Sequence, residues 1–281
     1  MSTTPEFHVV KKGDTLDKIA RTYSLKSDMF LFDHKFNAKL KSKRKKPEMI
    51  QPGDKVFLPP PDVKSIKTHF TRKGPRMTID VDGPKALIFV QQKWSYEYTK
   101  QSLATKWTSA QKRKFHTDVD KAIWKAWSGK FKLKVEGKSQ FAKAFKDTIF
   151  TVNFDIKSVT SGGHWKVKVL KIAVGGGHEG SSVDWNKQTI QLDTLDTVFR
   201  IRTKEGKQFK QVTAAHEFGH AIGNTWVKAR GDEYHVNHTH EFERKSMMNV
   251  GMQLKKRHAR TLVEDLNKMI PDTKFKIVGS G

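Results

Sequence analysis

Residues 211–223 read QVTAAHEFGHAIG, and this stretch decides how the rest of the chain is interpreted. The pattern is typical of a helix, and His216 and His220 are four residues apart, so both imidazoles lie on one face of it. Neutral imidazole nitrogens suit zinc, which in catalytic sites commonly takes three protein ligands and one water. Glu217 is positioned to accept a proton from that water. The stretch therefore predicts a site for one catalytic Zn²⁺ with Glu217 as general base.

The composition is that of a soluble globular protein, with 36% hydrophobic and 10% aromatic residues among 281. Lysine and arginine number 54 against 29 acidic residues, and the net charge of +25 attracts polyanions and anionic surfaces. The basic residues are spread along the whole chain, so charge alone assigns no partner, and we expect no nucleic acid. There is no cysteine, so a metal site must use nitrogen and oxygen ligands.

The first sixty residues are predicted to form a small unit with the order strand, helix, helix, strand. The stretches that indicate this order are VKKGDTL at 10–16, IA at 19–20, Asn37 and PGDKVFLP at 52–59. They resemble a LysM domain over roughly residues 6–60. The resemblance implies binding to glycans that contain N-acetylglucosamine, such as peptidoglycan. The basic segment KSKRKK at 41–46 departs from the family pattern and leaves open a purely docking role, as in phage-tail-like machines.

The rest of the chain is predicted to be a linker over 61–75 and a second domain over 76–281. Consecutive prolines at 59–61 and a polar, basic composition indicate the linker. Alternating apolar residues predict a hairpin over 77–90 and later strands, and a capping box at Thr108 begins a long helix that ends near residue 128. The predicted fold class is α+β, with a mixed, largely antiparallel sheet packed against that helix and the motif helix.

The motif helix and the sequence after it resemble zincin metallopeptidases. The stretch SMMNVG at 246–251 is similar to the methionine turn of metzincins, which lies beneath the metal site in that family. From about residue 200 to 266, the order of motifs is similar to that of the metallopeptidase effectors attached to type VI secretion spike proteins. The resemblance implies a zincin-like domain that binds peptide along an edge strand, and we expect Thr189–Asp193 to be that strand and to border the cleft.

The third zinc ligand is not where metzincins have it. Their pattern is H-E-x-x-H-x-x-G-x-x-H or ends in Asp, and Trp226, which cannot coordinate zinc, occupies the final position. Asp232 could serve if residues 224–230 form a looped-out insertion. Glu264, on a later predicted helix, could serve as the ligand does in gluzincins. We favour Glu264, because resemblance to the spike-borne effectors implies a downstream glutamate.

Two further residues are candidates for catalysis. Tyr234 and His258 are suited to donating a hydrogen bond to the tetrahedral intermediate, as oxyanion donors do in such sites. His235, His238 and His240 crowd one short loop, and we expect at least two of them to be solvated residues without a role.

Three functions are compatible with these features. The first is an antibacterial effector, exported without a signal peptide, that cuts proteins or peptides in the periplasm or envelope of a target cell. The second is a peptidoglycan hydrolase that cleaves the stem peptide or cross-link. The third is a non-enzymatic wall-binding or baseplate protein. Implied partners are the substrate, a glycan, a spike or baseplate protein and an immunity protein, and no transmembrane segment is expected.

Overall fold

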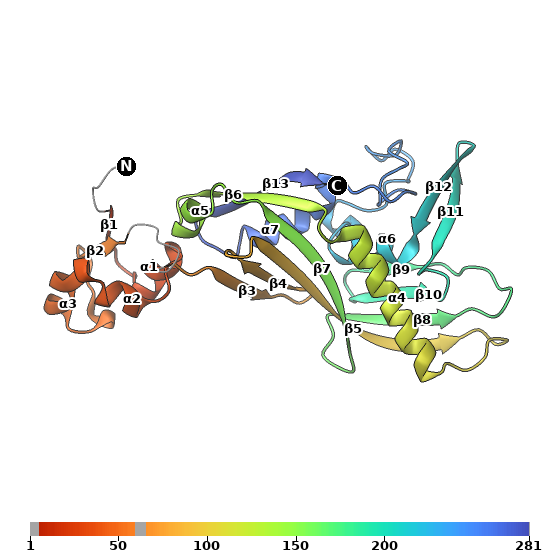
Figure 1. The fold of residues 1–281 in the computed structure, drawn as a ribbon, viewed down its shortest axis with the longest axis horizontal. Helices are drawn as coiled ribbons and strands as arrows, with labels where there is room; N and C mark the ends of the chain where they lie inside the picture. Colours follow the sequence, from red (N-terminus) through yellow and green to blue (C-terminus); the bar gives the residue numbers. More distant parts are fainter. Residues whose placement is uncertain (1–5, 60–65, 281) are drawn as a thin grey trace.

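A computed structural model describes residues 6–59 and 66–280 of the chain. Figure 1 shows an N-terminal module at one end of an elongated molecule and a larger body built on one sheet. The module contains two strands and three α-helices, which are β1 (Glu6–Val9), α1 (Leu16–Thr22), α2 (Asp28–Asp33), α3 (Ala38–Arg44) and β2 (Lys55–Leu58).

The module has the predicted order of strand, helix, helix and strand, with α3 as an addition. Strands β1 and β2 pair antiparallel, so that Phe7 lies opposite Phe57. Thr15 caps α1 by accepting a hydrogen bond from the Lys18 amide, and the apolar face of that helix is buried. The side chain of Asn37 joins the second helix to β2, because its Nδ2 donates to the carbonyls of Leu31 and Phe57.

The basic segment 41–46 folds back onto the turn before β2. Arg44 donates two hydrogen bonds to the buried Asp54 carboxylate, at 2.7 and 2.9 Å, and Lys43 Nζ lies 3.1 Å from it. The Arg44 guanidinium beside Asp54 holds the pKa of that carboxyl well below its usual range. Part of the positive charge in this segment therefore stabilises the module itself.

The predicted linker over 61–75 is wrong for the part that follows residue 65, and residues 60–65 lie outside the described part of the chain. Ile66 is buried and forms a β-bridge with Leu25, and β3 (His69–Lys73) pairs with β4 (Thr78–Asp82). The strand was missed because only Phe70 of its five residues is buried, so the polar side chains dominate its composition.

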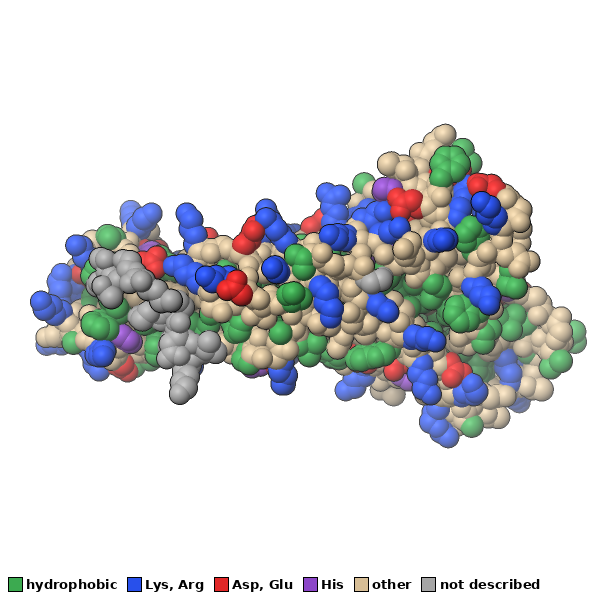
Figure 2. Space-filling model, turned by 45° about the horizontal axis from the view of Figure 1, so that its top comes forward, with side chains coloured by type: hydrophobic (Ala, Val, Ile, Leu, Met, Phe, Trp, Pro, Cys, Tyr) green, Lys and Arg blue, Asp and Glu red, His purple; other side chains and the backbone are tan. Residues whose placement is uncertain are grey.

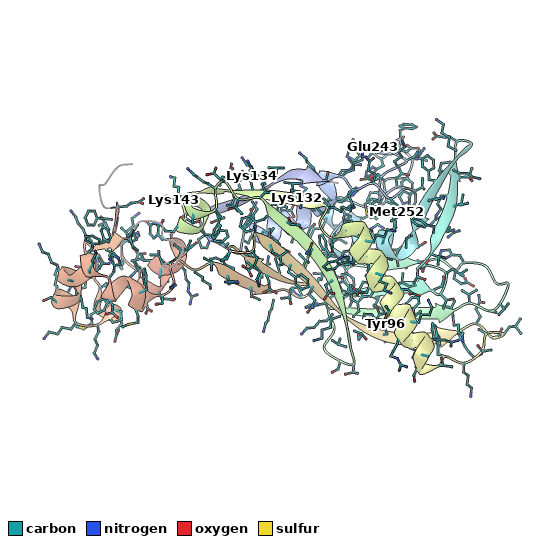
Figure 3. The ribbon with its side chains drawn as sticks, viewed as in Figure 1. Tyr96, Lys132, Lys134, Lys143, Glu243 and Met252 are labelled. Atoms are coloured by element: carbon teal, nitrogen blue, oxygen red, sulfur yellow. The ribbon has the colours of Figure 1, made fainter. Side chains whose placement is uncertain are left out.

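The module contacts the body through α5 (Gln140–Ala144). The Gln140 amide donates to the Tyr23 carbonyl, and Lys143 Nζ forms an ion pair with Glu6 at 3.0 Å. Figure 3 shows Lys143 at the end of the body that faces the module.

The body is built on a mixed nine-stranded sheet with the order β13-β6-β7-β5-β8-β10-β9, to which β4 and β3 are added beside β5. Three pairs, β5 with β7, β5 with β8 and β8 with β10, are parallel, and the other five are antiparallel. The strands not yet given are β5 (Leu87–Lys100), β6 (Phe131–Gly137), β7 (Phe150–Val159), β8 (Trp165–Lys171), β9 (Ser182–Asp184), β10 (Thr189–Asp193) and β13 (Thr273–Ser280). The predicted mixed and largely antiparallel sheet is confirmed.

Helix α4 (Ser109–Trp127) packs across this sheet, and it begins at the predicted capping box of Thr108 and Gln111. Its buried residues are Phe115, Val119, Ile123 and Trp127, one face at helical spacing. No helix in the described parts of the chain has both the length and the apolar character to cross a bilayer. On the face seen in Figure 2, Lys and Arg side chains are distributed over the module and the body.

Replacement of Asp54 by Asn should destabilise the N-terminal module more than replacement of Asp33 does, because it removes the charged partner of Arg44 and weakens the turn before β2. Hydrogen–deuterium exchange of the amides in residues 6–58 measures the free energy of opening of the module. Asp33→Asn is the matched control, since the Asp33–Lys41 pair is about half exposed and should contribute less than about 1 kcal/mol. Equal effects of the two changes would contradict this account.

Candidate metal centre

The motif helix α6 (Thr213–Ala221) begins two residues later than predicted, because Gln211 and Val212 end strand β12 (Lys207–Val212). That strand and β11 (Phe199–Lys204) form a hairpin that projects from the body in Figure 1. The helix is held against α4, since Trp127 Nε1 donates to the Ala215 carbonyl at 2.9 Å and the Phe218 ring packs edge-on against Trp127.

Three side-chain atoms converge at the surface of α6. Asp232 Oδ1 lies 2.9 Å from His216 Nε2 and 3.1 Å from His220 Nε2, and the two Nε2 atoms are 3.2 Å apart. All three residues are largely buried, with side-chain exposures between 5 and 17%. Two imidazoles and one carboxylate are a donor set that zinc accepts, so the residues present fit the metal that the motif predicts.

The hydrogen bonds of the two histidines orient them for a metal. His216 Nδ1 lies 2.7 Å from the Met247 carbonyl, and His220 Nδ1 contacts the Asn224 carbonyl. A carbonyl only accepts hydrogen bonds, so each Nδ1 carries a ring proton, and Nε2, which faces Asp232, is the nitrogen that would bind a metal. This arrangement is the one that metal-ligating histidines require.

The SMMN turn packs against the motif helix. Met247 and Met248 are buried, and a side chain at Gly219 would collide with the sulfur of Met248. Gln211 Nε2 donates to the Asn249 carbonyl at 2.9 Å, which joins the turn to the end of β12. The turn and the helix are therefore in close contact at Gly219.

A closed loop brings Asp232 back to the histidines. The amide of Arg230 donates to the Thr225 carbonyl at 2.9 Å, so the intervening residues bulge outward and Trp226 is 57% exposed. A side chain at Gly231 would collide with the Trp226 ring. Residues 224–230 are thus looped out, which is the condition under which Asp232 could serve.

Glu264 is not part of this cluster, so the preference for it over Asp232 is corrected. It lies on α7 (Arg260–Leu266), where its carboxylate is 3.3 Å from Arg230 Nη2 and 3.5 Å from Arg260 Nε. A carboxylate that pairs with two arginines at a 42% exposed position is a surface ion pair. Three residues of the predicted four-residue metal set, His216, His220 and Asp232, lie together, and Glu264 does not join them.

The structure also does not place His258 where it could act as the predicted oxyanion donor. It is buried, its Nε2 lies 3.2 Å from both Glu233 and Ser246, and its Nδ1 accepts from the Lys255 amide. With both ring nitrogens engaged, it cannot donate to a substrate. Burial lowers the pKa of His258.

His258 instead belongs to a network that positions Asp232. Arg257 donates to both oxygens of the Glu233 carboxylate, at 2.6 and 3.0 Å, and the Glu233 amide donates to the Met248 carbonyl at 2.7 Å. Arg257 also pairs with Glu243, which Figure 3 shows on the loops of this region. Because Glu233 follows Asp232 directly, this network holds the Asp232 backbone next to the SMMN turn.

Tyr234 remains beside the cluster. Its ring lies 6.3 Å from that of His216 and nearly parallel to it, and burial together with the Asp232 charge raises the pKa of Tyr234, which keeps its hydroxyl protonated. His235, by contrast, is half exposed, and His240 pairs with Glu243.

The electrostatics favour a proton acceptor at Glu217. Burial raises the pKa of Glu217, and the histidines and Arg202 act in the opposite direction. For His220, burial opposes the charged form, but the hydrogen bond to Asp232 raises its pKa to about 9. The sequence did not point to Arg202, which lies in β11 and is brought near Glu217 and Tyr234 only by the hairpin.

Strand β10 is not a free edge, so the expectation that it receives a peptide is corrected. Residues 189–191 pair with β8 on one side and with β9 on the other, which leaves no open edge there. The short strand β9 was missed because it spans three residues with no strongly apolar pattern.

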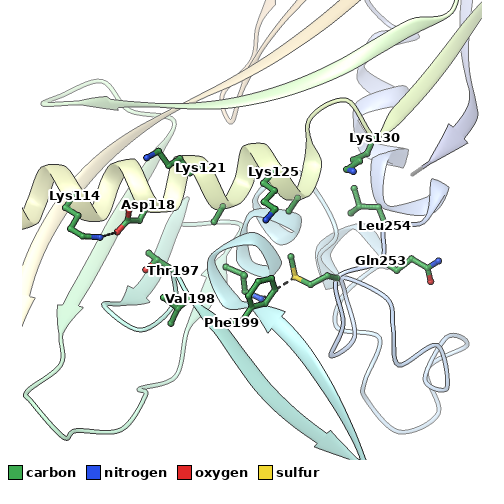
Figure 4. Close-up of a pocket in the computed structure, with 14 residues that line it drawn as sticks. Lys114, Asp118, Lys121, Lys125, Lys130, Thr197, Val198, Phe199, Gln253 and Leu254 are labelled. Carbon is green, nitrogen blue, oxygen red and sulfur yellow. Dashed lines mark hydrogen bonds and ion pairs between the residues drawn. The ribbon is translucent and has the colours of Figure 1, made fainter.

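A groove of about 810 Å³ lies between α4 and the β11–β12 hairpin (Figure 4). Its floor includes Phe199, Val212 and Met252, and lysines of α4 lie along its rim. None of the candidate metal ligands lines it, so it is separate from the chemistry described above.

One comparison with known proteins identifies part of the chain. Residues 8–30 match the LysM domain. The match covers the second half of β1, all of α1 and the first half of α2, and it supports glycan binding, including peptidoglycan, by the N-terminal LysM module. No curated protein and no solved structure matches the chain.

Replacement of Asp232 by Asn should lower the zinc that the protein retains after dialysis by about one equivalent, because a ligand loses its charge while the loop keeps its shape. Glu264→Gln is the matched control and should leave the zinc content unchanged. Metal content is measured by mass spectrometry of the dialysed protein. Loss of zinc on Glu264→Gln, with zinc retained by Asp232→Asn, would reverse the assignment of the third ligand.

Proposed function

We propose that this protein is a zinc-dependent metallopeptidase carried behind a LysM module. The observation that supports this most strongly is the convergence of His216 Nε2, His220 Nε2 and Asp232 Oδ1 next to the buried Glu217. These three atoms would hold the ion. Bound zinc supplies a water of lowered pKa, toward about 7, and polarises the scissile carbonyl.

The side chains around the cluster have separate roles in this proposal. Glu217 accepts the proton of the attacking water and delivers it to the leaving amine, and its buried position makes it a stronger base than an exposed glutamate. Tyr234, protonated and partly buried, donates a hydrogen bond to the oxyanion of the tetrahedral intermediate. Asp232 would hold the ion, and the Glu233–Arg257 pair keeps the Asp232 backbone in place.

The biological role that we propose is that of an exported antibacterial effector acting on proteins or peptides in the cell envelope. Support comes from the glycan-binding module joined to a candidate hydrolytic site, together with the similarity of the motif order to spike-borne effectors. The LysM match favours one alternative, a peptidoglycan hydrolase, because the module would concentrate the site on wall peptides. A spike or baseplate protein and an immunity protein are proposed partners.

Glu217→Gln should reduce turnover by a factor of at least about 10² while the zinc content stays at the wild-type level, because Glu217 acts on the proton and is not a ligand. The zinc-loaded protein is incubated in parallel with purified sacculi and with a denatured protein mixture. Release of muropeptides selects the hydrolase, and fragments of the protein mixture select the peptidase.

Glu264→Gln serves as the active control in both assays. Wild-type activity in Glu217→Gln would refute the proposed mechanism. Stoichiometric zinc without cleavage of either substrate would favour the non-enzymatic wall-binding alternative.

A further inference from the structure

A second cluster of metal-ligating side chains lies outside the candidate metal centre. His178 follows the glycine run at 175–177, Asp193 is the last residue of β10, and Asp196 lies in the turn after it. His178 Nδ1 is 2.8 Å from Asp193 Oδ2 and 3.3 Å from Asp196 Oδ1. One imidazole and two carboxylates from three separate positions therefore meet at one point.

The hydrogen bonds of the two carboxylates leave one oxygen without a donor. Asp193 accepts from the amides of Glu179 and Leu195, and Asp196 Oδ2 accepts from Ser181 Oγ and the Asp193 amide. Asp196 Oδ1 has no hydrogen-bond donor, although Asp196 is fully buried. His178 Nδ1 lies nearer to Asp193, and it forms no hydrogen bond with Asp196 Oδ1.

The charge of the cluster is also unbalanced. Asp193 and Asp196 have side-chain exposures of 1 and 0%, and among the described residues no lysine or arginine forms an ion pair with either. Arg202 lies near enough for its charge to act on Asp196, but it makes no such contact. Two buried carboxylates without a cation are costly, and a bound cation would offset that cost.

An ordinary histidine–aspartate pair does not need this arrangement. His69 pairs with Asp82 at 2.9 Å through one carboxylate, at a position where the imidazole is 65% exposed. At His178 a second carboxylate has its free oxygen directed at the same imidazole nitrogen. An imidazole with two carboxylates suits a first-row divalent ion such as zinc, whereas calcium prefers oxygen ligands alone.

We propose that His178, Asp193 and Asp196 bind a second divalent metal ion of the zinc class. The side chain of His178 is 14% exposed, which gives the ion a path from solvent. The backbone carbonyl of Asp196 accepts a hydrogen bond from the Ala214 amide at 3.0 Å, in the first turn of α6. A metal at this point therefore ties the glycine-rich segment and the end of β10 to the start of the motif helix, and its role is structural.

The test uses the full chain with the first cluster removed by His216→Ala and His220→Ala. Titration of this background with Zn²⁺ alone, followed by calorimetry, should give about one equivalent bound, and the melting temperature should rise by several degrees. Adding Asp196→Asn should abolish both effects, because the amide keeps the existing hydrogen bonds but removes the charge. Adding His69→Ala, a matched histidine–aspartate pair, should leave both unchanged.

The proposal is overturned if the background binds no zinc, or if zinc binding survives the addition of Asp196→Asn. If the double-alanine background does not fold, the comparison is made in the wild-type chain. There the two equivalents of bound zinc should fall to one on Asp196→Asn, and an unchanged zinc stoichiometry would overturn the proposal. Failure of the second metal site is distinguishable from failure of the proposed peptidase. The peptidase proposal would fail if His216→Ala and Asp232→Asn both kept the wild-type zinc content, or if Glu217→Gln kept its activity.

Discussion

The hydrogen bond between His216 Nδ1 and the Met247 carbonyl is the contact on which the candidate site depends. It fixes the imidazole with Nε2 toward Asp232, and it joins the motif helix to the SMMN turn. The same turn accepts the Glu233 amide at Met248, so it also determines where Asp232 lies. One turn thus aligns ligands from two segments that are sixteen residues apart.

The second constraint is the burial of α6 between the sheet and α4. Eight of its nine residues are buried, so the histidines and Glu217 are held on a rigid element in surroundings of low polarity. Burial raises the proton affinity of Glu217, which is the property that a general base requires. The fold and the proposed chemistry therefore depend on the same packing.

Local patterns in the sequence were sufficient for the long elements of the body. Helix α4 was predictable because a capping box and four apolar residues at helical spacing agree, and β7 because its apolar residues alternate. Strand β3 and the β11–β12 hairpin were not, since most of their side chains are polar and few are buried, and only pairing with distant or neighbouring strands makes them strands.

The candidate site divides in the same way. His216, Glu217 and His220 are local in sequence and could be identified directly, whereas the third ligand depends on whether a loop closes. The small residue Gly231, packed against Trp226, was the available signal that residues 224–230 loop out and return Asp232 to the helix.

The most direct test of the central claim is a crystal structure of the zinc-loaded protein with anomalous data collected at the zinc absorption edge. Our account predicts an anomalous peak bound by His216 Nε2, His220 Nε2 and Asp232 Oδ1, with Glu217 beside it. A peak coordinated by Glu264 in place of Asp232, or no peak between the two histidines, would contradict it.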